Sequence, residues 1–292
     1  SLPPTPTNIS QLDLTELCKY RINDNDLELL ATVGFGAFAE VWKGMYNGEI
    51  VAVKRLLPNQ NADSNIESFI NEIKLFATFN SPSIVRLIGV AWTTPLDLKC
   101  VMELMDLGDL RDYLVHHDKK SFTWKEKLEC LKSIASGLNY LHSLSVVHRD
   151  LKSRNVLMDS VKGTKLVDFG VAKEDLYGTM TVAVGTFRWM APEVLHDTSY
   201  NTSADVYSFG MVLTEMDSHQ IPYQDIRNLK TGQPLADPAI IAGVMNGSIK
   251  PSFGKDCPEW ITSLADKCLK LDPTERPTMY QVVAQLVKVD IE

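Results

Sequence analysis

The prevailing spacing of apolar residues changes near Gly108, from mostly strand-like to helical. Between Leu27 and Cys100, short apolar runs that partly alternate are separated by turn residues such as Asn47-Gly48, which is typical of β-strands. The runs are LELLATVGF, AEVWKGMY, EIVAVKRLL and KCVMEL. Among them, SNIESFINEIKLFATF has helical spacing and opens with Ser64-x-x-Glu67, an N-cap pattern.

After Gly108 the pattern is helical. Thr123-x-x-Glu126 and Thr278-x-x-Gln281 each predict a capped helix start, and SADVYSFGMVLTEM predicts a helix that is mostly buried. In DPAIIAGVMNG we expect Asp237 to cap a helix and Gly247 to end it. A small β-rich lobe followed by a larger helical lobe predicts an α+β fold with a ligand cleft between the lobes.

The composition is that of a globular protein and excludes several classes. The 292 residues are 45% hydrophobic and 23% charged, and the formal charge of −8 argues against a nucleic-acid partner. The five cysteines are scattered, without CxxC spacing, which favours reduced thiols and a cytoplasmic location. No apolar run is long enough for a membrane segment, although the first residue is Ser1, so a parent protein could still be membrane-attached.

Residues 1–26 are expected to form an N-terminal extension. Its opening, SLPPTPTNIS, predicts a flexible segment, and Ser10-x-x-Asp13 is similar to a capping box that precedes a short helix. We expect this extension to pack against the main domain, and a regulatory docking role is the alternative.

The stretch VGFGAFAEV, from Val33 to Val41, has two glycines at which a backbone can approach phosphate closely. Downstream, Lys54 ends the apolar strand VAVK, where an unpaired lysine is costly to bury. Taken alone, Lys54 is better explained by a side chain that extends to solvent from a strand edge. With the glycine loop upstream, we expect Lys54 to hold the phosphates of ATP and Glu72 to orient it.

Two further motifs carry the chemistry of phosphoryl transfer. They are HRDLKSRN, from His148 to Asn155, and DFG, from Asp168 to Gly170. The reaction needs a nucleophile held in line and Mg²⁺ to offset phosphate charge. Asp150 can accept the proton of a substrate hydroxyl, and Asn155 and Asp168 offer hard oxygen ligands for Mg²⁺.

Together these motifs resemble the protein kinase family over nearly the whole chain. The resemblance continues through APE, Asp205 in DVYSFG and Arg276 in DPTERPT. It implies the two-lobed protein kinase fold over residues 27–292, with an N-lobe at about 27–102, a hinge at about 103–108 and a C-lobe at about 109–292. It also implies that Glu193 pairs with Arg276 and that Asp205 supports the backbone of the catalytic loop.

Within the family the chain resembles the tyrosine-kinase-like branch. MAPE preceded by Trp189 is similar to tyrosine kinases, whereas Lys152 and Thr186 stand where serine/threonine kinases carry a lysine and a threonine. The resemblance implies that Lys152 contacts the γ-phosphate and that Thr186 braces Asp150 and Lys152. We therefore expect transfer to serine or threonine hydroxyls of a protein substrate, with a dual-specificity or tyrosine kinase as the alternative.

The resemblance also implies a nucleotide site, with Met102 as gatekeeper, Glu103 to Met105 as hinge and Asp109 at the ribose. Val41, Ala52 and Leu157 would enclose the base, and without a nucleotide they are ordinary core residues. The full set of expected ATP contacts is Val33, Gly34, Gly36, Ala37, Phe38, Val41, Ala52, Lys54, Met102, Glu103, Met105, Asp109, Leu157 and Asp168.

Ala39 stands where the family loop has its third glycine. At that position the chain turns back into a strand, a conformation that alanine can adopt at negative φ. We expect Ala39 to tune the loop without disabling it. The alternative is a pseudokinase scaffold, which normally lacks one of the catalytic residues, but Lys54, Asp150, Asn155 and Asp168 are all present.

A regulatory switch is predicted between DFG and APE. The segment contains Tyr177, Thr179 and Thr181, and Arg149 precedes the catalytic aspartate. A phosphate on this segment would pair with Arg149 and order the segment. We expect it on Thr179 or Thr181, and the alternative is that these hydroxyls have no regulatory role.

Overall fold

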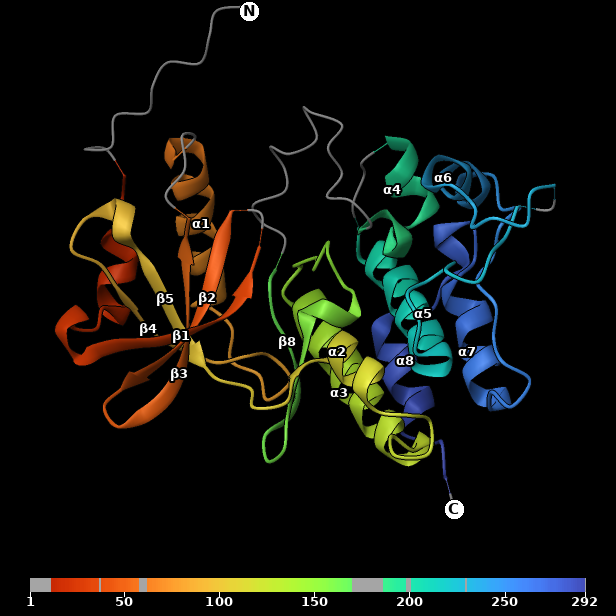
Figure 1. Cartoon of the computed structure of the whole chain (residues 1–292), viewed down its shortest axis with the longest axis horizontal. Helices are drawn as coiled ribbons and strands as arrows, with labels where there is room; N and C mark the ends of the chain where they lie inside the picture. The colour runs from red at the N-terminus through yellow and green to blue at the C-terminus, as the bar shows by residue number, and fades with distance from the viewer. Residues whose placement is uncertain are drawn as a thin grey trace, which may run out of the picture. The chain divides into compact units, whose positions relative to one another are not determined.

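The computed structural model describes residues 12–36, 38–57, 62–169, 186–197, 201–228 and 230–291, without the side chains of 62–64 and 197. These residues fall into two compact units that divide between Met105 and Asp106. The first unit is built on a β-sheet, and the second is mainly helical (Figure 1). The predicted α+β class, with its β-rich part first, is confirmed.

An antiparallel five-stranded sheet forms the first unit, in the order β1-β2-β3-β5-β4. Its strands are β1 (Leu27–Phe35), β2 (Ala39–Tyr46), β3 (Glu49–Leu56), β4 (Leu87–Ala91) and β5 (Lys99–Glu103). Asn47 and Gly48 join β2 to β3 with φ values of 51° and 79°, as a type I′ hairpin turn requires. Val51, Val53 and Val101 form the fully buried centre of this sheet.

The sequence pattern does not predict β4, which is short and has Gly89 in its middle. A glycine inside a strand weakens the strand signal and often marks a close approach of another segment. Here a Cβ on Gly89 would collide with Cγ2 of Ile22. The glycine therefore makes room for the N-terminal segment, a contact that local sequence does not reveal.

Helix α1 (Ala62–Phe76) is the helix of the first unit. Its predicted face is confirmed, because Ile66, Phe69, Ile70 and Ile73 are all buried. The predicted N-cap at Ser64 is wrong, since the helix already begins at Ala62. Alanine has the highest helix propensity, which favours extension of the helix through this residue.

Residues 12–26 pack against the first unit, as expected for the N-terminal extension. The predicted short helix is a 3₁₀ helix at Thr15–Tyr20, and its Leu17 is fully buried. Tyr20 Oη donates to Ala77 O at 2.8 Å, and Arg21 Nη2 donates to Trp92 O at 3.0 Å. Ser10, the residue proposed to start the capping box, lies outside the described residues.

The second unit combines a small sheet with seven helices among its described residues. The sheet contains β6 (Gly108–Asp109), β7 (Val156–Asp159) and β8 (Gly163–Leu166). The helices are α2 (Leu110–His116), α3 (Trp124–Ser143), α4 (Pro192–Asp197), α5 (Thr202–Ser218), α6 (Asp237–Met245), α7 (Glu259–Cys268) and α8 (Met279–Leu286). Both predicted capping boxes are confirmed, at the starts of α3 and α8. Helix α5 is buried along most of its length, as its apolar sequence predicts.

The start of α6 differs from the expectation. Ala236 is the N-cap residue, and Asp237 is the first residue of the helix, without a side-chain capping bond. The carboxylate of Asp237 instead accepts from Arg188 Nη2 at 2.7 Å. Gly247 has a φ of 74° after the last turn of α6, as expected of a helix-ending glycine.

Candidate active site

Lys54 in β3 and Glu72 in α1 are brought together. Lys54 Nζ lies 2.7 Å from Glu72 Oε1, and the two side chains are 16% and 18% exposed. Strand pairing holds Lys54 between Val41 of β2 and Cys100 of β5. A lysine that is mostly removed from water needs such a partner, and the contact fixes the direction of its ammonium group.

Gly34 is the second-last residue of β1, and Gly36 lies in the turn that leads to β2. Gly36 N donates to Ala39 O at 2.7 Å, and a Cβ on Gly36 would lie 3.3 Å from that oxygen. Ala39 begins β2, pairs with Leu56 and does not have a positive φ. Alanine therefore fits the third loop position without backbone strain.

The apolar residues predicted to contact ATP differ in exposure. Ala52 and Met102 pair across β3 and β5 and are 7% and 5% exposed. Val33 and Phe38 are 55% and 43% exposed, so both side chains are accessible. Ala37, also predicted to contact ATP, lies outside the described residues.

Glu103, the first hinge residue, forms two hydrogen bonds with the backbone of Arg86. Its Oε1 accepts from Arg86 N at 2.7 Å, and its own N–H donates to Arg86 O at 3.0 Å. The single backbone N–H of Glu103 is therefore already used by the carbonyl oxygen of Arg86. Met105, at the other end of the predicted hinge, is 5% exposed.

Asp109, predicted at the ribose, pairs with Leu157 across β6 and β7. Its Oδ1 caps α2 by accepting from Asp112 N at 2.8 Å. Its Oδ2 lies 2.9 Å from Nη1 of Arg154, which also contacts Asp112 at 2.9 Å. Arg154 is visible within HRDLKSRN, but this contact follows only from the fold. A ribose hydroxyl would have to share Asp109 with it.

The catalytic loop brings Asp150, Lys152 and Asn155 together. Lys152 Nζ lies 3.0 Å from Asp150 Oδ2, and Asn155 Nδ2 donates to the same oxygen at 3.0 Å and to Asp150 O at 2.8 Å. Lys152 Nζ also contacts Thr186 Oγ1 at 3.3 Å, one of the two contacts that the family resemblance implied for Thr186. The carboxylate of Asp150 is therefore oriented by two donors from its own loop.

The two predicted metal ligands, Asn155 and Asp168, lie on neighbouring segments. Val167 N donates to Asn155 O at 3.1 Å, so the residue before Asp168 is fixed to the catalytic loop. Asp168 has a φ of 60°, an unusual backbone conformation for an aspartate. One amide and one carboxylate suit Mg²⁺, which keeps several waters and takes phosphate oxygens as further ligands.

Asp205 of α5 supports the catalytic loop, as expected. It is 1% exposed, and its carboxylate accepts from the backbone N–H of His148 at 2.8 Å and of Arg149 at 3.0 Å. Arg149 has a φ of 67°, so these bonds hold a strained backbone. His142 Nε2 also lies 2.9 Å from Asp205, a contact that sequence reasoning missed because 63 residues separate the two.

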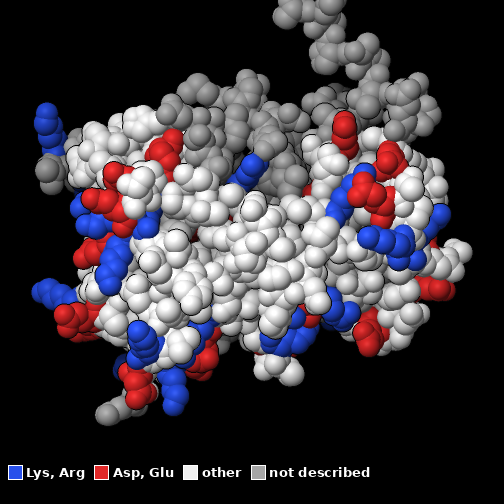
Figure 2. Space-filling view, turned by 180° about the vertical axis from the view of Figure 1, so that it is seen from behind, with Lys and Arg blue, Asp and Glu red and all other residues white. Residues whose placement is uncertain are grey.

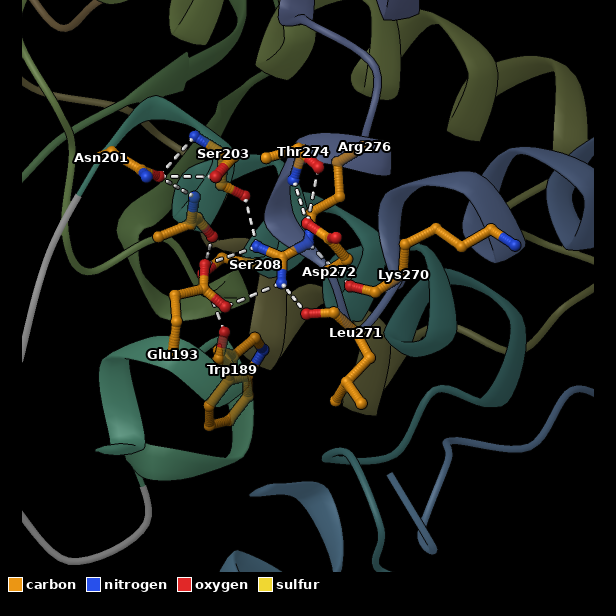
Figure 3. A network of polar contacts seen from close by, with 11 residues as sticks. Trp189, Glu193, Asn201, Ser203, Ser208, Lys270, Leu271, Asp272, Thr274 and Arg276 are labelled. Carbon is orange, nitrogen blue, oxygen red and sulfur yellow. Dashed lines mark hydrogen bonds and ion pairs between the residues drawn. The ribbon is translucent and has the colours of Figure 1, made fainter. Parts of the chain in front are cut away.

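Glu193 and Arg276 form the expected pair, which Figure 3 shows at the centre of a polar network. The two guanidinium nitrogens lie 2.6 and 2.8 Å from the two carboxylate oxygens, a bidentate geometry. Arg276 also donates to the carbonyl oxygens of Ser203, Lys270 and Leu271. Its side chain has no exposed surface.

The predicted regulatory residues are only partly described. Arg149 lies in the catalytic loop, whereas Tyr177, Thr179 and Thr181 lie outside the described residues, as does Gly170 of DFG. The phosphorylation switch therefore stays a prediction.

The surface and the helices give two general observations. On the face seen in Figure 2, basic and acidic side chains of the described residues are interspersed, without a continuous basic patch. Within the described part of the chain, no helix is both long and apolar enough to cross a bilayer.

Residues 27–287 match the family model described as the protein kinase domain. The chain belongs to the protein kinase family. The motif-based assignment is thereby confirmed, and the matched residues include every residue of the candidate active site described above.

The kinase domain is also similar to curated proteins of plants and amoebae. It is 32% identical over 269 residues to the serine/threonine-protein kinase STY17 and 33% identical over 272 residues to STY46, both of Arabidopsis thaliana. Each match covers 92% of this chain and 45% of the relative. The probable serine/threonine-protein kinase kinX of Dictyostelium discoideum is 32% identical over 289 residues, 97% of this chain and 25% of that protein. The chain thus spans less than half the length of these relatives.

Proposed function

We propose that the chain is an ATP-dependent protein kinase that transfers the γ-phosphate of Mg-ATP to serine or threonine hydroxyls of protein substrates. The observation that carries this proposal is the position of Lys152 Nζ, 3.0 Å from Asp150 and 3.3 Å from Thr186. This arrangement places a cation beside the candidate base and in contact with a threonine. The three relatives above are all named as serine/threonine-protein kinases. Their names also support serine and threonine as the residues that receive the phosphate.

Each charged side chain has a distinct role in the proposed reaction. Asp150 accepts the proton of the substrate hydroxyl, and Lys152 offsets the charge on the transferred phosphate. Lys54, oriented by Glu72, binds the phosphates of ATP. Asn155 and Asp168 would hold Mg²⁺, which when bound neutralises phosphate charge. The protein thus contributes positioning and electrostatic stabilisation rather than covalent chemistry.

The test is transfer of labelled phosphate from ATP in the presence of Mg²⁺. Wild type and Asp150→Asn are incubated with a mixed peptide substrate, and we expect the variant to lose transfer. Asp266→Asn is the matched control, because it removes an exposed carboxylate on α7, outside the catalytic loop. Equal transfer by wild type and Asp150→Asn would contradict the assignment of Asp150.

Phosphoamino acid analysis of the product separates the alternatives. Phosphoserine and phosphothreonine support the proposal, and phosphotyrosine would indicate a tyrosine or dual-specificity kinase. A thermal shift with Mg-ATP but no labelled product would indicate a scaffold that binds nucleotide without transfer.

We further propose that phosphate on Thr179 or Thr181 activates the domain. After incubation with ATP, mass spectrometry should find phosphate on at least one of them. The double variant Thr179→Ala/Thr181→Ala should then lower activity. Full activity of that variant, without phosphate on the segment, would refute this switch and leave the transfer activity standing.

The proposed location is the cytoplasm, which supplies ATP and keeps thiols reduced. All five cysteines are free, and three of them, Cys100, Cys130 and Cys268, are buried. Reduced, buried thiols of this kind suit a reducing compartment. The cytoplasmic location can be tested by fractionation with an antibody to the full-length protein.

A further inference from the structure

Besides Asp205, helix α5 contains two further buried carboxylates, Glu215 and Asp217. Glu215 has no exposed surface, and both of its oxygens accept hydrogen bonds. Ser153 Oγ donates to Oε1 at 2.5 Å, and Trp189 Nε1 donates to Oε2 at 2.7 Å. Burying an acidic group is costly, so a pair of bonds of this kind points to a specific role.

The two partners of Glu215 lie on two different segments. Ser153 directly follows Lys152 in the catalytic loop, and Trp189 ends the 3₁₀ helix that begins with Thr186. These are the same two segments that Lys152 and Thr186 connect through their own 3.3 Å contact. The segments are therefore joined twice, once at the catalytic lysine and once through Glu215.

The same face of α5 holds Trp189 at a second point. Ser208 lies seven residues before Glu215, a spacing that places both side chains on one side of the helix. Ser208 Oγ donates to Trp189 O at 2.8 Å (Figure 3). Helix α5 therefore binds both the backbone and the indole of Trp189, through Ser208 and Glu215, and these two hydrogen bonds position the residue.

We propose that Glu215 is a positioning residue for phosphate transfer, which acts through Ser153 and Trp189 to keep Lys152 in contact with Asp150 and Thr186. The inference rests on the proposed kinase function. Glu215 does not touch the reacting atoms, and its effect is on the spacing of the two segments.

Hydrogen-bond chemistry predicts which replacements can take the place of Glu215. The indole N–H of Trp189 can only donate, whereas the hydroxyl of Ser153 can donate or accept. A glutamine can therefore accept from Trp189 and donate to Ser153. A leucine can do neither, and it leaves the indole N–H buried without its acceptor.

The test compares Glu215→Leu and Glu215→Gln with a matched control on the same helix. Asp217 is also buried, but its carboxylate accepts from Gly254 N at 2.6 Å rather than from the catalytic loop. Asp217→Leu therefore removes a buried acid of α5 without touching Ser153 or Trp189. For each protein, kcat, KM for ATP and the thermal midpoint are measured.

We expect Glu215→Leu to lower kcat by about tenfold to a hundredfold, since small misplacements of catalytic groups have effects of this size. KM for ATP should change by less than about threefold, because the substituted residue contacts no predicted ATP group. Glu215→Gln should recover most of the lost kcat. Asp217→Leu should lower the thermal midpoint at least as much as Glu215→Leu while kcat stays near that of wild type.

A double-mutant cycle shows whether Glu215 acts through the Lys152–Thr186 contact. Thr186→Ala should lower kcat, and adding Glu215→Leu should lower it by much less than the product of the two single effects. If Glu215→Leu fails to fold, Trp189→Phe replaces it in the cycle, because it removes only the indole donor.

Three results would overturn the inference: wild-type kcat in Glu215→Leu or Trp189→Phe, an equal loss of kcat in Asp217→Leu, or multiplicative effects in the cycle. Failure of the proposed function looks different. In that case wild type itself transfers no phosphate, whatever residue stands at 215, and the inference falls with it.

Discussion

The two units hold their key charged residues in different ways. In the first unit Lys54 and Glu72 meet side chain to side chain, from a strand and a helix, and each is partly exposed. In the second unit the buried Asp205 binds the backbone N–H groups of His148 and Arg149. A contact between two long side chains is lost when either element shifts, whereas bonds to the backbone fix the path of a loop. Lys54 therefore depends on the position of α1, whereas the catalytic loop is fixed by α5.

The largest expected effect comes from breaking the buried pair of the second unit. Arg276→Met leaves the Glu193 carboxylate and three carbonyl oxygens without the guanidinium. We expect a loss of about 3–5 kcal/mol in the free energy of unfolding, as for other buried pairs with one partner removed. Urea unfolding of both proteins measures it. A loss below about 1 kcal/mol, the value typical of a surface pair, would show that burial does not distinguish Arg276 from Lys54.

The next effect is on catalysis rather than on stability. Lys54→Met should lower kcat/KM by about a hundredfold to a thousandfold, the range found when one preorganised electrostatic group is removed. The free energy of unfolding should fall by less than in Arg276→Met, by about 1–2 kcal/mol, because Lys54 is less buried than Arg276 and methionine fits an apolar strand. Transfer assays and urea unfolding of the same preparation separate the two. Wild-type turnover would rule out Lys54 as a phosphate ligand.

A smaller effect concerns pH and the buried carboxylate of Glu215. Burial raises the pKa of Glu215 from 4.5 to about 7, although bonds from Ser153 and Trp189 and the charge of Arg111 act in the other direction. At pH values between 4.5 and about 7, Glu215 binds more protons in the folded state than in the unfolded state. The stabilising contribution of this group is therefore complete below pH 4.5 and is lost as pH rises through 7.

Glu215→Gln cannot titrate and serves as the reference for this pH effect. The free energy of unfolding of wild type, minus that of Glu215→Gln, should fall as pH rises from 4.5 to 7, by on the order of 1–3 kcal/mol. Urea unfolding at several pH values measures this difference, in which the other titrating groups largely cancel. A difference that is flat or rises with pH would contradict the raised pKa.

The smallest effect is expected in the glycine loop of the first unit. Ala39 begins β2 without a positive φ, so Ala39→Gly adds backbone freedom without relieving strain. KM for ATP should change only a few-fold, equivalent to about 1 kcal/mol or less. Steady-state kinetics at varied ATP concentration measures it. A rise in activity by orders of magnitude would show that alanine impairs the natural loop.

Local chemistry explains what could be predicted. The Asn47-Gly48 turn and the capping box of Thr123 and Glu126 depend on residues that are neighbours in the chain, and both are present as expected. The Lys54–Glu72 contact was also anticipated, because the family resemblance supplied a pairing that spacing alone does not.

The misses at Asp237 and Gly89 have the opposite cause, which is competition from residues distant in the chain. Asp237 has the right residue type for a cap, yet its carboxylate pairs with Arg188, 49 residues away. In the sequence, Gly89 only weakens the strand pattern. In the structure, the absence of its side chain leaves room for Ile22. The role of Arg154 at Asp109, like that of His142 at Asp205, follows from how the strands and helices pack.

The sequence by itself thus determined the family, the order of β-rich and helical parts, and the chemical groups available for phosphate transfer. Motifs such as HRDLKSRN suffice for this because they bring the reactive residue types together within a few positions. The role of Asp205 was implied by the family resemblance, whereas that of Glu215 follows only from the tertiary structure. Asp205 and Glu215 lie on α5, 57 and 62 residues from the loop groups that they bind. Their roles depend on the buried position of α5 beside the catalytic loop. A carboxylate that is buried there is costly unless hydrogen-bond donors of that loop compensate for the lost water.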